Sequence, residues 1–316
     1  MFKRHYQKRS TNPLFVIFRL SLSLIMFAVL FIGAYAAYKH FSGLDPLKVD
    51  PQVLVNTILR TEKLDKLSKM LPSQESNILF QFLLVADSHN DNANLKKAIS
   101  QAKQAYPDLQ FIIGLGDYTD VGTKEELKKA KNEFDLSNLR YFLLVGDHDL
   151  WDARNRELVA TSNFKEVFGL SYQSFTFKDF RFILLNNADN YLGIEGDQQE
   201  WIALELDKAK IDGAKGIFIF VHEPLFHPSS EHVMGSVESK LKLQAKSLIF
   251  QLKAVGVLKI FAGDIHYFSE YEEPETKLSM VTAGAVGIAR NPQSPRFAVV
   301  SVREDGSTKM EDVEIK

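Results

Sequence analysis

The chain has 316 residues, of which 45% are apolar and 25% are charged, an ordinary composition for a globular protein that can bury a sizeable core. Its formal net charge of -2, without a basic face or an RNA-binding signature, gives no reason to expect nucleic acid as a partner. Because the sequence contains no cysteine, disulfides, thiolate nucleophiles and cysteine-based zinc sites are excluded, and any bound metal must use histidine and carboxylate ligands.

The N-terminal part of the chain has the pattern of a membrane signal anchor. An almost uninterrupted apolar run covers residues 20–38, about the length that a helix needs to cross a bilayer. Residues 1–19 are basic and are expected on the cytoplasmic side, which places the rest of the chain outside the cytoplasm. The alternative is a secretory signal cleaved at Ala34-Tyr35-Ala36, which would make the protein secreted. The uncleaved anchor is favoured because the run exceeds the roughly 7 to 15 apolar residues of a signal core.

Residues 39–77 are polar again and are interpreted as a juxtamembrane linker that contains one helix. Within it, Asp50-Pro51 resembles an N-cap followed by proline at the first helical position. The functional domain is expected over residues 78–316, beginning with strands that alternate with helices. The expected strands cover residues 78–86, 109–115 and 140–145, and the expected helices cover residues 94–105, 124–134 and 154–168.

The second half of this domain begins with a different pattern. Residues 174–187 contain two alternating apolar runs separated by Lys178-Asp179, which predicts a β-hairpin. The chain then continues with a helix, a strand, a second helix and a second strand, over residues 197–210, 216–221, 239–254 and 258–262. From residue 278 onward it consists of short strands, with an Asp-Gly turn at residues 305–306.

Acidic residues and histidines follow five of the expected strands directly. They are Asp87, His89, Asp117, Asp147, His148, His222, Asp264 and His266. Open α/β sheets place their chemistry at the carboxyl ends of strands, so these side chains should converge, with Asp117 bridging the cluster. Carboxylates and imidazoles without thiolates suit Mn, Fe, Zn or Mg. Eight possible ligands favour two divalent ions, and such a pair, roughly 3.5 to 4 Å apart, would support a phosphoryl displacement.

The order of these motifs resembles that of the calcineurin-like metallophosphoesterase family. The matching segments are Asp-x-His at 87–89, Gly-Asp-x-x-Asp at 116–120, a Gly-Asn-His-Asp-like turn at 146–149, His-x-Pro at 222–224 and a Gly-His-x-His-like segment at 263–266. The resemblance covers residues 78–316 and implies an α/β fold, a four-layer α-β-β-α sandwich of two mixed sheets. It also implies a hydrolase that cleaves a phosphomonoester or phosphodiester by attack of a metal-bound hydroxide at a dinuclear centre.

The resemblance also implies roles for individual side chains. The first metal would be held by Asp87, His89, Asp117 and His266. The second metal would share Asp117 and would be held otherwise by Asp147, His222 and Asp264. His148 would face the leaving group as an acid or as a donor to the phosphate, oriented by Asp120 as histidine–carboxylate pairs generally are.

Two positions differ from the family pattern, and both fall on the second metal site. Asp147 stands where the family usually has asparagine, and Asp264 replaces the first histidine of the last motif. With four carboxylates, two dications would be close to neutral, so attraction for a phosphate dianion should be weaker. The second site should prefer Mn or Mg over Zn.

These replacements leave three interpretations open: a working hydrolase with altered metal preference, an enzyme that uses chiefly the first metal, and a degenerate site. The degenerate site would belong to a non-catalytic exported domain that binds metal or an anionic envelope ligand. Asp149 is interpreted as a cap or as a partner of a ligand residue, with a direct role in the site as the alternative. His227 and His232 are expected in a solvated loop, although they could touch substrate or lend a ligand to the altered site.

Overall fold

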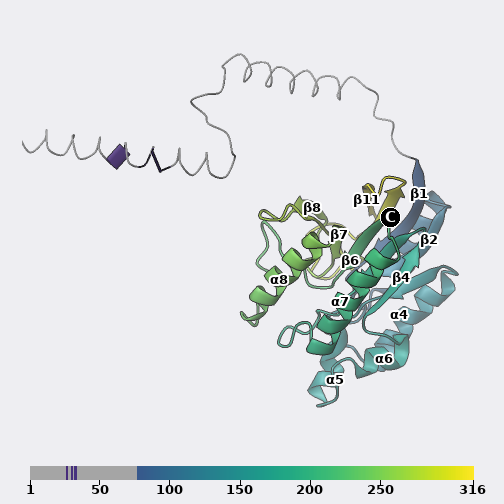
Figure 1. Cartoon of the computed structure of the whole chain (residues 1–316). Coiled ribbons are helices and arrows are strands. Elements are labelled where there is room, and N and C mark those ends of the chain that lie inside the picture. Colours follow the sequence, from purple (N-terminus) through teal and green to yellow (C-terminus); the bar gives the residue numbers. More distant parts are fainter. Residues whose placement is uncertain (1–25, 28–29, 31, 34–76) are drawn as a thin grey trace, which may run out of the picture. The chain divides into compact units, whose positions relative to one another are not determined.

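The structure of the protein is a computed structural model that describes residues 26–27, 30, 32–33 and 77–316. Two mixed β-sheets form the centre of residues 77–316 (Figure 1). The first sheet has the strand order β11-β10-β1-β2-β3. Its strands are β1 (Ile78–Val85), β2 (Leu109–Gly114), β3 (Arg140–Leu143), β10 (Arg296–Arg303) and β11 (Thr308–Glu314). β1, β2 and β3 run parallel, whereas β10 is antiparallel to both β1 and β11.

The second sheet has the order β4-β5-β6-β7-β9-β8. Its strands are β4 (Gln173–Phe177), β5 (Phe180–Leu184), β6 (Gly216–Phe220), β7 (Val257–Ala262), β8 (Ser269–Glu272) and β9 (Ser279–Thr282). β5, β6, β7 and β9 are parallel, and the two edge strands are antiparallel to their neighbours. The carboxyl ends of the parallel strands therefore lie along one edge of each sheet.

Successive side chains along a strand point to opposite faces of the sheet, and this alternation explains how the sheets pack. In β1, Phe80, Phe82 and Leu84 enter a core of phenylalanine rings between the two sheets. Leu83 and Val85, one residue out of phase, face the opposite side and pack with α3 (Asn92–Ala105) and α4 (Lys124–Leu136). The outer face of the second sheet is covered by α7 (Gly196–Ile211) and α8 (Leu241–Ala254) (Figure 1). This arrangement confirms the predicted α-β-β-α sandwich of two mixed sheets.

Local signals account for several element boundaries. Lys178 and Asp179 form the turn between β4 and β5, both with the left-handed φ values of 49° and 66° that a tight hairpin needs. The single helix predicted over residues 154–168 is wrong. The chain instead forms the 3-10 turn η1 (His148–Leu150), α5 (Trp151–Asn155) and α6 (Ser162–Phe168). Glu157 interrupts the helical path with a φ of 58°, although the apolar spacing continues through it.

Residues 76–316 form one compact unit. Within the part of the chain that the structure describes, no helix is long and apolar enough to cross a membrane. The expected anchor at residues 20–38 lies outside the described residues apart from positions 26–27, 30 and 32–33. The basic segment 1–19 and residues 39–76 of the linker also lie outside them.

Candidate metal centre

The predicted ligands occupy tight turns at the ends of β1, β2, β3, β6 and β7. Five of them have left-handed backbone conformations, with φ between 41° and 71°: Asp87, His89, Asp117, Asp264 and His266. This region costs a non-glycine residue roughly 1 kcal/mol or more, and strain of this kind concentrates at functional sites. Backbone hydrogen bonds between the turns stabilise it, including Asp87 N to Gly116 O and His89 N to Asp117 O.

Four of the ligands form a first cluster in which one ligand atom from each lies within 4.8 Å of the others. They are Asp87, His89, Asp117 and His266, all of them buried. The Nε2 atoms of His89 and His266 are 3.1 Å apart, and His89 Nε2 is 3.5 Å from Asp117 Oδ2. His266 Nδ1 lies 3.1 Å from the backbone carbonyl of Arg290, which makes Nδ1 the protonated nitrogen and leaves a lone pair on Nε2.

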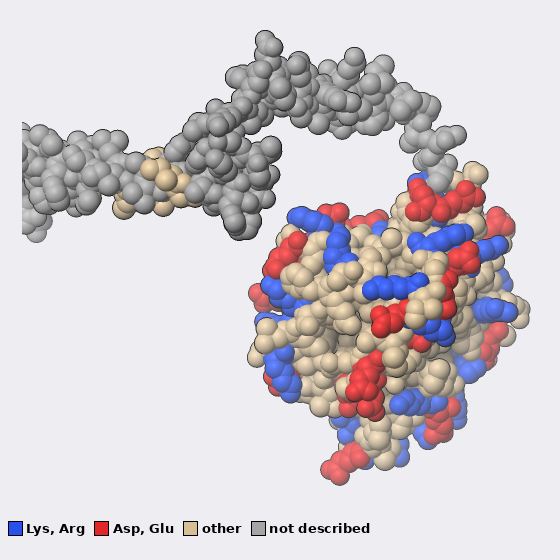
Figure 2. All heavy atoms as spheres, viewed as in Figure 1, with Lys and Arg blue, Asp and Glu red and all other residues tan. Residues whose placement is uncertain are grey.

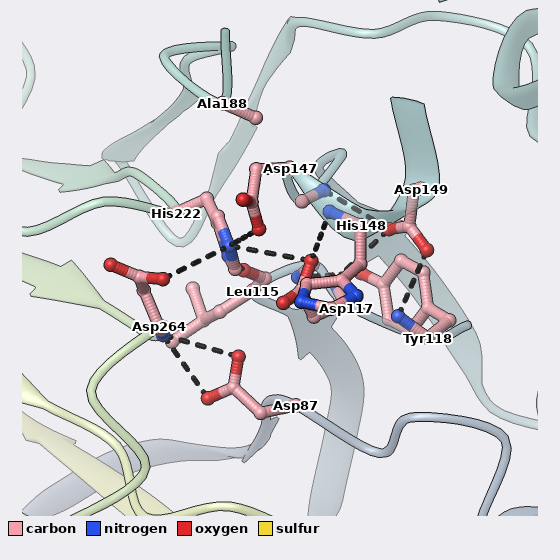
Figure 3. Close-up of polar contacts among 12 residues, drawn as sticks. Asp87, Leu115, Asp117, Tyr118, Asp147, His148, Asp149, Ala188, His222 and Asp264 are labelled. Carbon is pink, nitrogen blue, oxygen red and sulfur yellow. Dashed lines mark hydrogen bonds and ion pairs between the residues drawn. The ribbon is translucent and has the colours of Figure 1, made fainter. Parts of the chain in front are cut away.

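Asp147, His222 and Asp264 form a second cluster, again within 4.8 Å (Figure 3). His222 donates through Nδ1 to the carbonyl oxygen of Leu115 at 2.7 Å, so Nε2 is the nitrogen that a metal could coordinate. Nε2 is buried and has no hydrogen-bond partner. It faces the Oδ1 atoms of Asp117, Asp147 and Asp264 at 3.4, 3.6 and 3.7 Å.

The chemistry of these donors fits two divalent cations. A buried nitrogen without a partner is costly, and Asp264 Oδ2 is a second buried polar atom without one. Asp117 contributes Oδ2 toward the first cluster and Oδ1 toward the second, as expected for a bridging carboxylate (Figure 3). An ion in each cluster would satisfy the converging lone pairs and balance the carboxylates.

Electrostatics support this interpretation. Burial, together with the neighbouring His148 and His266, lowers the pKa of His89 to about 3, so this imidazole is neutral and able to coordinate a metal. Burial raises the pKa of Asp117. Burial alone would lower the pKa of His222, but the carboxylates around it, chiefly that of Asp117, raise it well above its usual value. Elsewhere the surface is mixed, and Figure 2 shows basic and acidic side chains interspersed over the face in view. The site thus crowds carboxylates together in a buried region, where a bound cation would stabilise their charged forms.

Asp149 holds the turns after β2 and β3 together. Its fully buried carboxylate accepts hydrogen bonds from the backbone N–H groups of Asp117, Tyr118 and Thr119 at 3.0 to 3.2 Å. It also accepts from Gly146 N at 3.0 Å. A Cβ atom on Gly146 would lie 2.1 Å from Asp117 Oδ1, so only glycine allows the bridging carboxylate to lie here. Asp149 is therefore a partner of the ligand-bearing backbone, one of the roles expected for it.

His148 forms a third group with Asp117 and Asp147, whose ligand atoms also lie within 4.8 Å of one another, and one of its expected contacts is different. Its Nδ1 is 2.7 Å from the backbone carbonyl of Asp120, where the sequence predicted a contact with the carboxylate. The Asp120 side chain is 58% exposed and accepts a hydrogen bond from Asn90 Nδ2 at 2.8 Å instead. The His148 ring also stacks on Trp151, with centroids 3.8 Å apart. His148 is thus oriented by a carbonyl and an aromatic ring.

A cavity of about 290 Å³ opens over the two clusters and is lined by Asp117, Asp147, His148, Asp264 and His266 together with residues from two loops. His232 was expected in a solvated loop, with a contact to the altered site as the alternative, and the structure shows that contact: its Nε2 lies 3.1 Å from Asp264 Oδ1. Sequence reasoning missed two contributors. Asn190 donates to Asp147 Oδ2 at 3.0 Å, and Arg290 reaches His148 Nε2 at 3.0 Å. Neither follows a motif, so no local signal distinguishes them. His227 lies apart from the ligands, with its Nε2 2.9 Å from Ser269 Oγ.

Comparison with known proteins gives a consistent result. The sequence model of the calcineurin-like phosphoesterase family matches residues 80–268. The chain is 27% identical over 224 residues to a serine/threonine-protein phosphatase, CPPED1, of Pongo abelii, covering 66% of this chain and 70% of that protein. It is 30% identical over 132 residues to a probable glycerophosphodiester phosphodiesterase, GpdQ, of Arcobacter nitrofigilis, covering 40% and 45% of the two chains. A dimetal phosphatase from Danio rerio has a similar fold, with a TM-score of 0.58 at 17% identity, over 76% of this chain and 99% of that one.

Proposed function

We propose that this chain, which belongs to the calcineurin-like phosphoesterase family and is therefore a hydrolase, cleaves a phosphomonoester or a phosphodiester at a dinuclear metal centre. The observation that carries the proposal is the division of the ligands into two clusters that share Asp117. A buried, unpartnered nitrogen at the centre of the second cluster supports a cation there. Asp147 and Asp264 keep the geometry of ligands in spite of their departure from the family pattern.

The proposed first ion is held by Asp87, His89, Asp117 and His266, and the second by Asp117, Asp147, His222 and Asp264. When bound, two such ions supply a nucleophilic water at neutral pH and neutralise charge on the phosphoryl group. The second set offers three carboxylates and one imidazole, which supports Mn or Mg at that position. The first set offers two of each, which suits Mn, Fe or Zn.

His148 has the proposed role of proton donor to the leaving group. Its Nδ1 is fixed on the carbonyl of Asp120, so Nε2 is the nitrogen that faces the cavity. Nε2 accepts a hydrogen bond from Arg290 Nη1 in this structure, so it can carry a proton for the departing oxygen only once Arg290 has turned to the substrate. Stacking on Trp151 restricts rotation of the ring. Proton transfer by a positioned histidine contributes roughly 10² to 10⁴ to the rate.

The test combines metal content with turnover. The purified chain is loaded with Mn, Mg or Zn, and hydrolysis of 4-nitrophenyl phosphate and of bis(4-nitrophenyl) phosphate is measured. We expect about two metals per chain and hydrolysis of at least one ester. His148→Gln should lower kcat by roughly 10² or more with unchanged metal content. No hydrolysis of either ester by the fully loaded wild-type chain would overturn the catalytic proposal and favour a domain that only binds metal or an anionic ligand.

We also propose that residues 20–38 anchor the enzyme in a membrane, with residues 1–19 in the cytoplasm and residues 78–316 outside it. The proposal rests on the length of the apolar run and on the basic residues before it. Protease treatment of intact cells should degrade the catalytic domain while the chain stays in the membrane fraction. Recovery of the domain in the medium would indicate a cleaved signal instead.

A further inference from the structure

Arg290 brings a positive charge into the metal cavity. It belongs to the loop between β9 and β10 and lines the cavity together with Asp117, Asp147 and Asp264. Its backbone carbonyl accepts from His266 Nδ1 at 3.1 Å, and its Nη1 lies 3.0 Å from His148 Nε2. The residue has a left-handed φ of 56°; its carbonyl faces one histidine and its side chain faces the other.

The guanidinium of Arg290 is not neutralised by a protein carboxylate. Among residues 77–316 it forms no ion pair, whereas Arg154, Arg181 and Arg296 each pair with a carboxylate. A guanidinium has five N–H donors, and the imidazole of His148 takes one of them. Arginine stays protonated at any physiological pH, so a cation with free donors faces the cavity.

The charge of the metal ligands explains why a positive side chain here would matter for phosphate binding. The four carboxylates of the clusters balance two divalent ions, which leaves the metal centre with little net attraction for a phosphate. Arg290 restores a positive charge at the cavity wall. A planar guanidinium also matches the oxygens of a phosphoryl group, because two parallel N–H bonds can form.

We propose that Arg290 binds the terminal oxygens of a phosphoryl group in this cavity and thereby makes the site selective for phosphomonoesters. This inference rests on the proposed function. A phosphomonoester offers three terminal oxygens and up to two negative charges, whereas a diester offers two oxygens and one charge. The second ester group of a diester would also bring a substituent toward the guanidinium that cannot accept a comparable charge-assisted hydrogen bond.

The first measurement is calorimetric binding of inorganic phosphate to the metal-loaded full chain, with Arg290→Gln and Arg290→Lys compared at equal metal content. The matched control is Arg140→Gln, an exposed arginine at the amino end of β3, remote from the strand ends that carry the ligands. We expect Arg290→Gln to weaken phosphate binding about tenfold or more, since it removes a hydrogen bond between charged groups. The phosphate affinity of Arg290→Lys should lie between those of Arg290→Gln and wild type, because lysine keeps the positive charge but cannot donate two parallel N–H hydrogen bonds. Arg140→Gln should bind as wild type does.

The second measurement is the ratio of kcat/KM for 4-nitrophenyl phosphate to that for bis(4-nitrophenyl) phosphate. Arg290→Gln should lower this ratio, because the monoester loses the larger interaction. If Arg290 only orients His148, kcat falls for both esters while phosphate affinity stays unchanged, and this result would overturn the proposal. The chain could bind phosphate in a manner that depends on Arg290 and yet hydrolyse neither ester. This result would refute the proposed function but would still support Arg290 as part of an anion-binding site.

Discussion

The most informative single substitution is Asp149→Asn, because it tests how the metal ligands are held in place. The wild-type carboxylate is fully buried and uses both oxygens. Oδ2 accepts from Asp117 N and Gly146 N, each at 3.0 Å. Oδ1 accepts from Tyr118 N at 3.1 Å and from Thr119 through N at 3.2 Å and Oγ1 at 2.8 Å. Asparagine keeps the shape of the side chain and replaces one of these acceptors with an NH₂ group.

The loss of stability expected for Asp149→Asn follows from the number of hydrogen-bond donors that contact each carboxylate oxygen. Whichever oxygen becomes nitrogen, at least two N–H groups then face another donor. Two hydrogen bonds to a charged acceptor contribute about 3 to 6 kcal/mol. Part of this loss is offset, because burial raises the pKa of Asp149 to about 6 and the neutral amide avoids the cost of a buried charge. We therefore expect a net loss of about 3 kcal/mol at pH 7, or roughly 6 to 12 °C in Tm.

Denaturant unfolding and metal titration would be measured on the same samples. Because Asp149 positions the backbone of the bridging Asp117, metal affinity should fall together with stability. The control is Asp120→Asn. Its carboxylate is 58% exposed and lies 4.0 Å from His89 Nδ1, whereas His148 contacts only the backbone carbonyl of Asp120. Its stability should stay within about 0.5 kcal/mol of wild type. If Asp149→Asn has the same free energy of unfolding and the same metal affinity as wild type, then Asp149 does not hold these turns in place.

Three further predictions concern the site and the domain around it. Gly146→Ala should cost about 1 to 3 kcal/mol and impair metal binding, because its Cβ would collide with Asp117; Gly196→Ala, with nothing within 4 Å, should be neutral in the same melting and titration assays. Burial favours a higher pKa for Glu205, but hydrogen bonds from Arg181 and Ser174 outweigh it and lower that pKa. The charged Glu205 side chain therefore stabilises the fold above the pKa that it has in the unfolded chain, and this stabilisation is lost as pH falls through its pKa in the folded protein. Glu205→Gln should lower the free energy of unfolding by about 1 to 3 kcal/mol at pH 7 and by less at pH 3. An equal loss at both pH values would contradict the role given to the Glu205 charge. Removal of the metal ions with a chelator should lower Tm by several degrees, because a metal at a free concentration of 100 times its Kd adds about 2.7 kcal/mol to the free energy of unfolding. An unchanged Tm would contradict tight metal binding.

The order of strands and helices and the convergence of the ligands could be predicted from local patterns, whereas the two-sheet sandwich and the division of the ligands between two metals were implied by the family resemblance. Apolar runs that end in Gly-Asp or Asp-x-His mark strand ends, and the carboxyl ends of parallel strands share one edge of a sheet. This rule was enough to group Asp87, Asp117 and His222 before any contact was known. The helix predicted over residues 154–168 failed because apolar spacing does not reveal that Glu157 adopts a left-handed conformation. The membrane anchor stays a prediction.

The sequence by itself determined which chemistry is possible, because residue types, the absence of cysteine and the strand-end spacing are local properties of the chain. Only the tertiary structure decided how that chemistry is supported. The carbonyl of Asp120 faces His148 in place of its carboxylate, and Arg290 reaches the same ring from 142 positions along the chain. Such contacts depend on strand order and on the paths of loops between the sheets. Neighbouring residues do not encode those paths, so the groups that orient His148 and bring a free cation into the cavity become visible only in the folded chain.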